Sequence, residues 1–141
     1  MKKVLLLLLA LTLFNCSNDD DSQSSDGDPI VGEWKLYRYY TMSNGQWVTS
    51  DLDNESWTET FNADGTYSWT EAGDSGSGTW ERMPNGQLRI SFSDGPFWQL
   101  TYNFYCGNNV ASYGFLLQEY SYLKKVGYNE DNCDEVTYPN E

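Results

Sequence analysis

The chain has 141 residues, of which 21 are acidic and 8 are basic, contains no histidine, and carries a formal net charge of −13 at pH 7. A surface this acidic repels phosphate backbones, whose binding depends on clustered lysine and arginine, so the charge excludes nucleic acid as a partner. The length leaves room for one domain of roughly 100 residues once the polar segments at both ends are set aside.

Residues 1–15 have the composition of a secretory signal peptide. Two lysines precede an apolar run that ends just before Asn15 and is too short to span a bilayer. Cys16 follows at the cleavage point. This order resembles the lipobox of bacterial lipoproteins of the Bacteroidetes type, in which the cysteine thiol receives a diacylglycerol and becomes the first mature residue. The resemblance implies lipidation of Cys16 and a lipid anchor in the outer membrane, and an ordinary signal peptide with an incidental cysteine is the alternative.

Residues 16–29 comprise this cysteine and an acidic stretch rich in aspartate and serine. The stretch has no apolar periodicity and cannot bury enough surface to offset its chain entropy, so we expect a flexible tether. An acidic run after the lipidated cysteine also resembles the export signal that sends such lipoproteins to the cell surface. The resemblance favours the cell surface over the periplasmic face, and a merely solvated linker is the alternative.

Residues 30–126 are expected to form the folded domain. Short segments rich in aromatic and β-branched residues alternate there with Gly, Asn and Asp turns, and no long helical period appears. The alternation predicts strands near Ile30–Thr41, Gln46–Asp51, Trp57–Asn62, Thr66–Glu71, Gly78–Met83, Gln87–Ser93, Phe97–Tyr105, Ala111–Glu119 and Ser121–Val126.

Tight turns join these strands, so consecutive strands are expected to pair antiparallel. Eight or nine short strands in such a meander are most economically arranged as an up-and-down barrel, which removes exposed edges, and a sandwich is the alternative. The dipeptides that supply the positive φ angles of primed hairpin turns are Asn44-Gly45, Asp64-Gly65, Asn85-Gly86 and Asp94-Gly95.

The first strand reads IVGEWKLYRYY, in which Gly32 and Trp34 form a Gly-x-Trp pair. The segments FNADGTYSW, GSGTWERMPNGQLRISF and EYSYLKKV follow in that order. Together they resemble the lipocalin-like domains of small secreted bacterial proteins. The resemblance implies an all-β, antiparallel, up-and-down lipocalin-like β-barrel of about eight strands, with Trp34 closing its base. The family usually packs an arginine against this tryptophan, and the candidates here are Lys124, Lys125 and Arg89.

With Cys16 used by lipid, Cys106 and Cys133 remain as a pair in an oxidising compartment. We predict a disulfide between them that pins the polar C-terminal tail, residues 127–141, to the last strands and stabilises the fold by about 3 kcal/mol. Two free or metal-binding thiols are the alternative. Zinc is disfavoured because the chain has no histidine and no closely spaced cysteines.

A barrel of about eight strands either holds one small ligand in its mouth or is filled by its own side chains. Alternation points the following side chains inward: Trp34, Leu36, Trp57, Phe61, Tyr67, Trp69, Trp80, Leu88, Ile90, Phe92, Trp98, Leu100, Tyr102, Phe115 and Leu117. Core packing is the default for all of them. Trp57, Trp69, Trp98 and Tyr102 are the candidate ligand contacts, because aromatic side chains with a polar atom suit a flat, partly polar ligand.

Catalysis has little to work with, because the chain has no histidine and no Gly-x-Ser-x-Gly elbow. Carboxylate pairs could hydrolyse glycosides at a defined separation, although solvated faces of an acidic protein are the better interpretation. The acidic run 129–135 could collect calcium but lacks the Gly-centred loop of an EF-hand, so neither metal nor cofactor is expected. The alternately spaced carboxylates are Asp51, Asp53, Glu55, Glu59 and Glu71.

Three functional hypotheses follow. The first is a non-catalytic envelope lipoprotein whose barrel binds a small apolar or aromatic ligand. The second is a surface protein with a filled barrel that binds an envelope protein or glycan, and an enzyme is the third. The outward aromatics that the second hypothesis requires are Tyr37, Tyr39, Tyr40, Trp47 and Tyr120.

Overall fold

The computed structural model of the chain describes residues 27–51, 57–115 and 119–139. The predicted signal peptide, Cys16 and nearly all of the tether lie outside the described residues. So do Asp53, Glu55 and Leu117, and the side chains of Asp51 and Phe115. Among the described residues, no helix has the length and apolar content needed to cross a membrane.

Ten β-strands and a 3₁₀ turn are formed within the described part of the chain. They are β1 (Gly32–Ser43), β2 (Gln46–Asp51), β3 (Thr58–Phe61), β4 (Thr66–Glu71), β5 (Asp74–Arg82), β6 (Leu88–Phe92), β7 (Phe97–Leu100), β8 (Tyr102–Tyr105), β9 (Val110–Phe115), β10 (Glu119–Lys125) and η2 (Glu130–Asn132).

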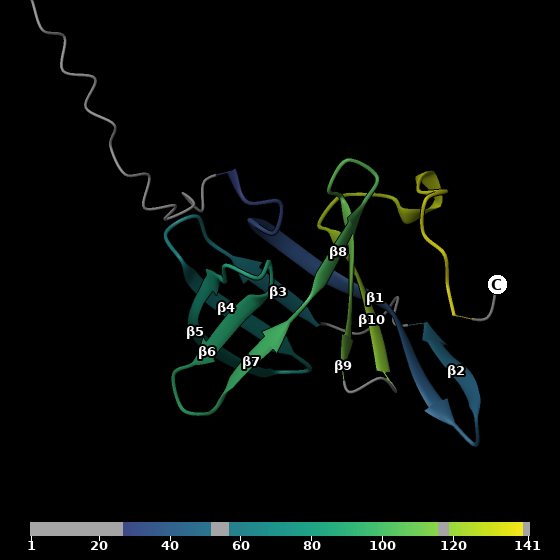
Figure 1. Cartoon of the computed structure of the whole chain (residues 1–141), viewed down its shortest axis with the longest axis horizontal. Coiled ribbons are helices and arrows are strands. Elements are labelled where there is room, and N and C mark those ends of the chain that lie inside the picture. The colour runs from purple at the N-terminus through teal and green to yellow at the C-terminus, as the bar shows by residue number, and fades with distance from the viewer. Residues whose placement is uncertain (1–26, 52–56, 116–118, 140–141) are drawn as a thin grey trace, which may run out of the picture.

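The strands form one antiparallel sheet with the order β7-β6-β5-β4-β3-β1-β10-β9-β8, and β2 pairs with β1 off this path. Its two edge strands, β7 and β8, are consecutive in the chain and separated only by Thr101. The segment 97–105 therefore pairs with β6 through its first half and with β9 through its second half, which brings the edges of the sheet together (Figure 1). The result is a nearly closed, up-and-down antiparallel barrel, as the sequence predicts.

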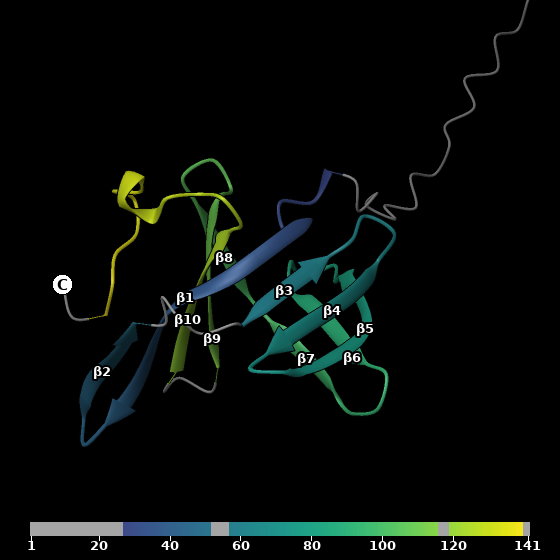
Figure 2. The same ribbon diagram turned by 180° about the vertical axis from the view of Figure 1, so that it is seen from behind.

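β1 is longer than the barrel requires. Its first half pairs with β3 and its second half pairs with β2, and Figure 2 shows this second half leaving the barrel as a two-stranded hairpin. Asn44 and Gly45, both at positive φ (53° and 77°), make the turn of this hairpin. The predicted bounds of β2 and β4 agree with the structure at both ends.

One prediction about a turn and one about the start of a strand were wrong. Gly95 does not adopt a positive φ, whereas Ala72 and Gly73 do, at 46° and 101°. The turn at Ala72-Gly73 starts β5 at Asp74 and not at the predicted Gly78. Alternation missed these four residues because the first half of β5 consists of small polar residues and glycine, which give no apolar signal.

The barrel interior holds the main hydrophobic core. Every described side chain of the predicted inward set belongs to it or packs against it, and the core also includes Ile30, Ala111, Tyr113 and Leu123. This agreement follows from the strict two-residue period of side chains along a paired strand.

One end of the barrel is closed by the N-terminal segment. Trp34 Nε1 donates to the carbonyl oxygen of the fully buried Ile30 at 2.6 Å. Lys125 Nζ lies 5.3 Å from the ring centroid of Trp34, so this lysine is the cation that faces the first-strand tryptophan. Of the other two candidates, Lys124 forms an ion pair with Glu130, and the guanidinium of Arg89 lies over Phe97.

A second buried cluster lies on the outer face of β1, β9 and β10. A β-bulge after Leu36 shifts the register of β1 against β10. Tyr37 and Tyr40, which follow Leu36 in β1, are buried beneath the C-terminal segment. Val110, Tyr122 and Val136 complete the cluster.

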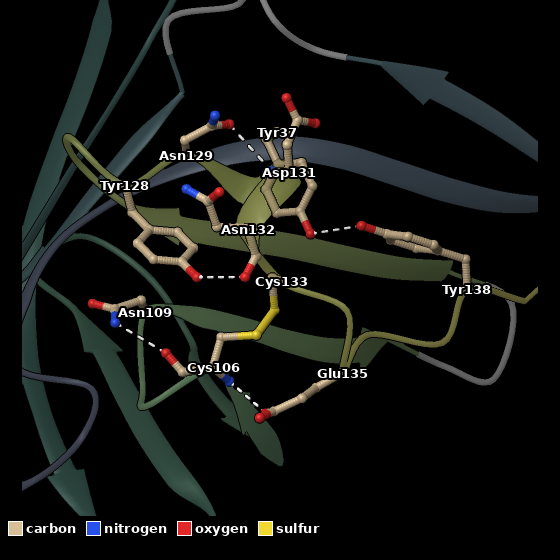
Figure 3. Close-up of a disulfide and its surroundings, with 10 residues drawn as sticks. All are labelled: Tyr37, Cys106, Asn109, Tyr128, Asn129, Asp131, Asn132, Cys133, Glu135 and Tyr138. Carbon is tan, nitrogen blue, oxygen red and sulfur yellow. Dashed lines mark hydrogen bonds between the residues drawn. A yellow bond between two sulfur atoms is a disulfide. The ribbon is translucent and has the colours of Figure 1, made fainter.

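The predicted disulfide between Cys106 and Cys133 is present and fastens this C-terminal segment to the barrel (Figure 3). Beside it, the backbone N–H of Cys106 donates to Glu135 Oε2 at 2.7 Å, and the hydroxyls of Tyr37 and Tyr138 lie 3.0 Å apart. The tail therefore serves as a cover for an aromatic face.

This cover corrects the proposed set of outward aromatics. Tyr37 and Tyr40 point away from the barrel but are not exposed. Tyr39 pairs with Ser121, which in turn pairs with Tyr113 of the inner core, so the bulge places Tyr39 on the inward side. Trp47 and Tyr120 are partly exposed and pack against each other at 5.4 Å.

Candidate ligand-binding site

A cavity of about 340 Å³ opens at the end of the barrel opposite Ile30 and Trp34. Antiparallel pairing brings to this end the beginnings of β3, β5 and β7 and the ends of β4 and β6. The residues that line the cavity are Trp57, Tyr67, Trp69, Phe92, Pro96 and Trp98.

Two aromatic pairs contribute to the lining. Trp57 and Trp69 are stacked, with ring centroids 5.7 Å apart and planes at 17°, and Phe92 and Trp98 meet edge to face at 4.7 Å. Tyr67 contacts Phe92 at 5.9 Å. The lining is thus almost entirely aromatic.

The position of Trp69 depends on a small residue in the next strand. Gly76 pairs with Trp69 across β4 and β5, and a Cβ atom at Gly76 would lie 2.4 Å from Trp69 Nε1. Only a glycine therefore allows the indole to lie across β5 in its present position.

The structure brings together three of the four predicted ligand contacts. Trp57, Trp69 and Trp98 line the cavity. Tyr102 is buried deeper in the core, where its ring contacts Phe61 at 6.1 Å and Tyr113 at 4.9 Å, and it does not line the cavity.

Three lining residues were not predicted as ligand contacts. Tyr67 and Phe92 were predicted to point inward, but alternation alone does not separate a cavity wall from packed core. Pro96 lies in the turn between β6 and β7, and nothing in the sequence marks a turn residue as part of the barrel mouth.

The interior also contains a carboxylate, Glu59, whose side chain is 1% exposed. Glu59 pairs with Trp34 on one side and with Trp69 on the other. Its Oε1 accepts a hydrogen bond from Trp57 Nε1 at 3.2 Å. The expectation that this glutamate is solvated was wrong, because it lies between Trp57 and Phe61 on the inward face of β3.

The surroundings of Glu59 are mostly neutral. Burial raises the pKa of this carboxyl to about 7, against the opposing effect of Trp57 and of the Tyr67 and Tyr102 hydroxyls. No contact between these hydroxyls and Glu59 has hydrogen-bond geometry: Glu59 Oε2 and both hydroxyl oxygens are buried without a partner. Burial likewise raises the pKa of Tyr67, Tyr102 and Tyr113, so all three phenols stay protonated.

No group of three or more histidine, cysteine or acidic side chains in the described part of the chain is arranged to hold a metal ion. The site offers instead an aromatic cavity and, behind its Trp57–Trp69 wall, one carboxylate among phenols. Such an arrangement suits non-covalent binding of a flat molecule.

No protein-family model matches the chain, and no curated protein matches it. A similar solved structure is the crystal structure of lobster apocrustacyanin A1, with 14% sequence identity and a TM-score of 0.45. The alignment covers 76% of this chain and 66% of the lobster chain, slightly less than two thirds of that protein. At this identity and TM-score the likeness carries no argument about a ligand, and the fold assignment rests on the strand pairing of the chain itself.

Proposed function

We propose that this protein is a lipid-anchored envelope protein whose lipocalin-like barrel binds a small, flat, apolar or aromatic ligand without a chemical step. The observation that carries the proposal is the cavity lined by Trp57, Trp69 and Trp98 together with three further apolar or aromatic side chains. The opposite end of the barrel is closed by Ile30 and Trp34, so a ligand enters from this end.

The size of the cavity restricts the ligand. A volume of about 340 Å³ is at the small end of the range for ligand pockets, roughly 300–1,000 Å³. Stacking against the indole faces favours an aromatic or conjugated ligand, since each well-placed aromatic pair contributes about 0.5–1.5 kcal/mol beyond the area that it buries.

The anchor is the second part of the proposal. The apolar run before Asn15, the cysteine at position 16 and the acidic residues after it favour a lipoprotein held in the outer membrane, with the barrel on the cell surface. Several acyl chains on one cysteine anchor a protein far more firmly than a single chain does. The acidic tether then gives the barrel mouth access to ligands outside the cell.

Ligand binding is tested on the full chain exported with a Cys16→Ser substitution, which removes the lipid site and leaves the barrel unchanged. Native and denaturing mass spectra of the purified protein reveal a co-purified molecule and its mass. Trp69→Ala is expected to lose that molecule. Phe97→Ala is the matched control, because Phe97 is 52% exposed and adjacent to Trp98 but does not line the cavity. Loss of the molecule from both variants, or from neither, argues against this site.

The anchor is tested by metabolic labelling of expressing cells with an alkyne fatty acid. The wild-type chain is expected to carry the label and to fractionate with the outer membrane, and Cys16→Ser is expected to do neither. Protease added to intact cells then distinguishes the two faces of the membrane. Digestion without lysis supports surface exposure, and protection until lysis places the barrel in the periplasm.

The alternative, a surface protein that binds an envelope protein or glycan through outward aromatics, has less surface to use than the sequence suggested. Tyr37 and Tyr40 are covered by the C-terminal segment, and Tyr39 is on the inward side of β1. Trp47 and Tyr120 remain, as a partly exposed pair. A clean apo spectrum together with loss of cell-surface partner binding in Trp47→Ala would favour this alternative.

A further inference from the structure

We propose that the ligand of this barrel carries a positively charged nitrogen, an amine or amidine attached to an aromatic ring system, and that this nitrogen binds Glu59 behind the wall formed by Trp57 and Trp69. The inference rests on the proposed function, because it names the chemical class of the ligand that the cavity takes.

Glu59 lies next to the residues that line the cavity. Glu59 lies directly across the β3–β4 ladder from Trp69, and its Oε1 accepts from Trp57 Nε1. Both tryptophans line the cavity and stack on each other. The indole of Trp57 therefore lies between the carboxyl group and the cavity, and binding of a ligand by Glu59 requires this indole to move aside.

Three buried polar atoms near the cavity have no hydrogen-bond partner. Glu59 Oε2, the Tyr67 hydroxyl and the Tyr102 hydroxyl come from β3, β4 and β8, and all three are buried without a hydrogen-bond partner. Buried polar atoms in proteins are nearly always satisfied, and the two hydroxyls act on the Glu59 carboxyl without a hydrogen bond of full geometry, so this group can take a further hydrogen-bond donor. Tyr67 connects this group to the cavity, because Tyr67 also contributes to the cavity lining.

The negative charge of the Glu59 carboxylate favours a positively charged ligand group. An ionised carboxylate accepts hydrogen bonds and cannot donate them, so it repels an anionic ligand group and favours a cationic donor. Ring faces of tryptophan attract cations, and the cavity presents three indoles. Besides burial, the groups that act on the Glu59 pKa are all neutral, so no cation among the described residues pairs with this carboxylate.

The pH dependence follows from the groups that face Glu59. These are Tyr67 on β4, Tyr102 on β8 and Tyr113 on β9, with Trp34 on β1 and Trp69 on β4 as its ladder partners. Burial raises the pKa of each of the three tyrosines, so none of them ionises below pH 9. Glu59 is thus the group in this set that changes charge between pH 5 and pH 8, and a cationic ligand should lose affinity as the pH falls.

The test uses two probes of the same shape, 1-naphthylmethylamine, which is cationic, and 1-naphthylmethanol, which is neutral. Isothermal titration calorimetry measures both probes at pH 8 on the exported full chain with Cys16→Ser. We expect the amine to bind about tenfold more tightly than the alcohol. In Glu59→Gln this preference should disappear while the affinity for the alcohol is retained.

Glu81→Gln is the matched control, because Glu81 is 62% exposed and is not one of the residues that line the cavity. It reports any general attraction of the amine to an acidic surface. A preference that falls equally in Glu81→Gln and Glu59→Gln overturns the inference. Equal affinities of the two probes in the unsubstituted barrel also overturn it, and they leave the proposed function intact with a water as the occupant of the polar group.

A third outcome concerns the proposed function itself. If neither probe binds and no molecule co-purifies, the proposed function fails and the inference fails with it. Should Glu59→Gln not fold, as judged by circular dichroism, the same preference is measured in the unsubstituted barrel at pH 5, where Glu59 is protonated and the amine remains charged. Persistence of the tenfold preference at pH 5 overturns the inference, and its loss supports it.

Discussion

The side chain of Arg82 holds that of Asp28 through two hydrogen bonds, Nε to Oδ2 at 2.8 Å and Nη2 to Oδ1 at 2.6 Å. The two residues are 54 positions apart in the chain, and both are largely buried, with side chains 15% and 7% exposed. Asp28 Oδ1 also accepts from the backbone N–H of Ile30. The pair therefore fixes the N-terminal segment across the closed end of the barrel.

Loss of the charge on Asp28 should destabilise the fold. Asp28→Asn leaves the guanidinium of Arg82 largely buried without its counter-charge, and we expect the free energy of unfolding to fall by about 2–3 kcal/mol. Urea denaturation followed by tryptophan fluorescence measures the change. Glu81 is the neighbour of Arg82 in β5, and Glu81→Gln breaks an exposed 3.6 Å ion pair with Arg89 of β6, so it should change the free energy of unfolding by less than about 0.5 kcal/mol. Equal effects of the two substitutions would show that the closed end does not depend on this ion pair.

The cavity should be sensitive to a methyl group at Gly76. In Gly76→Ala the new Cβ would lie 2.4 Å from Trp69 Nε1, so the indole must move out of its stack with Trp57. We expect the affinity for 1-naphthylmethanol to fall by about tenfold, although no lining side chain is truncated. Gly95→Ala is the control, because its Cβ would have an ordinary contact of 3.8 Å with Phe92. Unchanged affinity in Gly76→Ala would mean that the stacked position of Trp69 is not needed for binding.

Alternation and turn residues were enough to predict much of this fold. The inward face was predictable because side chains on a paired strand alternate strictly, and this is why Trp57, Trp69 and Trp98 could be chosen as candidates. The same rule places Glu59 inside, between Trp57 and Phe61, but the overall acidity of the chain favoured a solvated carboxylate. The alternation of side chains therefore predicted a buried glutamate at this position, but the acidic composition of the chain was given more weight.

Other features depend on contacts that a linear pattern does not contain. The bulge after Leu36 reverses the inward face of β1, and no residue type marks its position. Tyr37 and Tyr40 are covered because the C-terminal tail returns to the outer face of the barrel, where the disulfide holds it. The spacing of the two cysteines in the sequence does not show on which face the tail lies. The ion pair between Asp28 and Arg82 likewise joins segments with no common local signal.

The disulfide should matter for the tail more than for the cavity. In the double variant Cys106→Ser, Cys133→Ser, a cross-link between residues 27 positions apart is lost, and we expect the free energy of unfolding to fall by about 3 kcal/mol. The released tail should be cut by chymotrypsin after Tyr128 under native conditions, whereas the wild-type tail resists. Lys124→Met, which removes the ion pair to Glu130 and the contact of the ammonium group with the Tyr37 ring, should give intermediate cleavage. Rapid cleavage of the oxidised wild-type tail would contradict the view of this segment as a fixed cover.

Glu59 should make the stability of the barrel depend on pH in a defined direction. Burial raises the pKa of this carboxyl from 4.5 to about 7, so between these values the folded protein binds a proton that the unfolded chain has released. The contribution of Glu59 to the free energy of unfolding therefore does not change with pH below pH 4.5. It becomes increasingly unfavourable from pH 4.5 to about pH 7 and does not change with pH above that range. The full change amounts to roughly 3 kcal/mol.

Urea unfolding of the wild type and of Glu59→Gln from pH 4 to pH 8 tests this direction, because the amide cannot ionise. The two proteins should differ least at pH 4, and the variant should gain stability relative to the wild type until about pH 7. A cationic ligand at Glu59 would lower the pKa of the carboxyl and remove part of the penalty, so saturating 1-naphthylmethylamine should flatten the wild-type profile and leave that of Glu59→Gln unchanged. A difference between the two proteins that is constant with pH would show that Glu59 ionises as an exposed carboxyl does, and that the barrel interior is wetter than its burial implies.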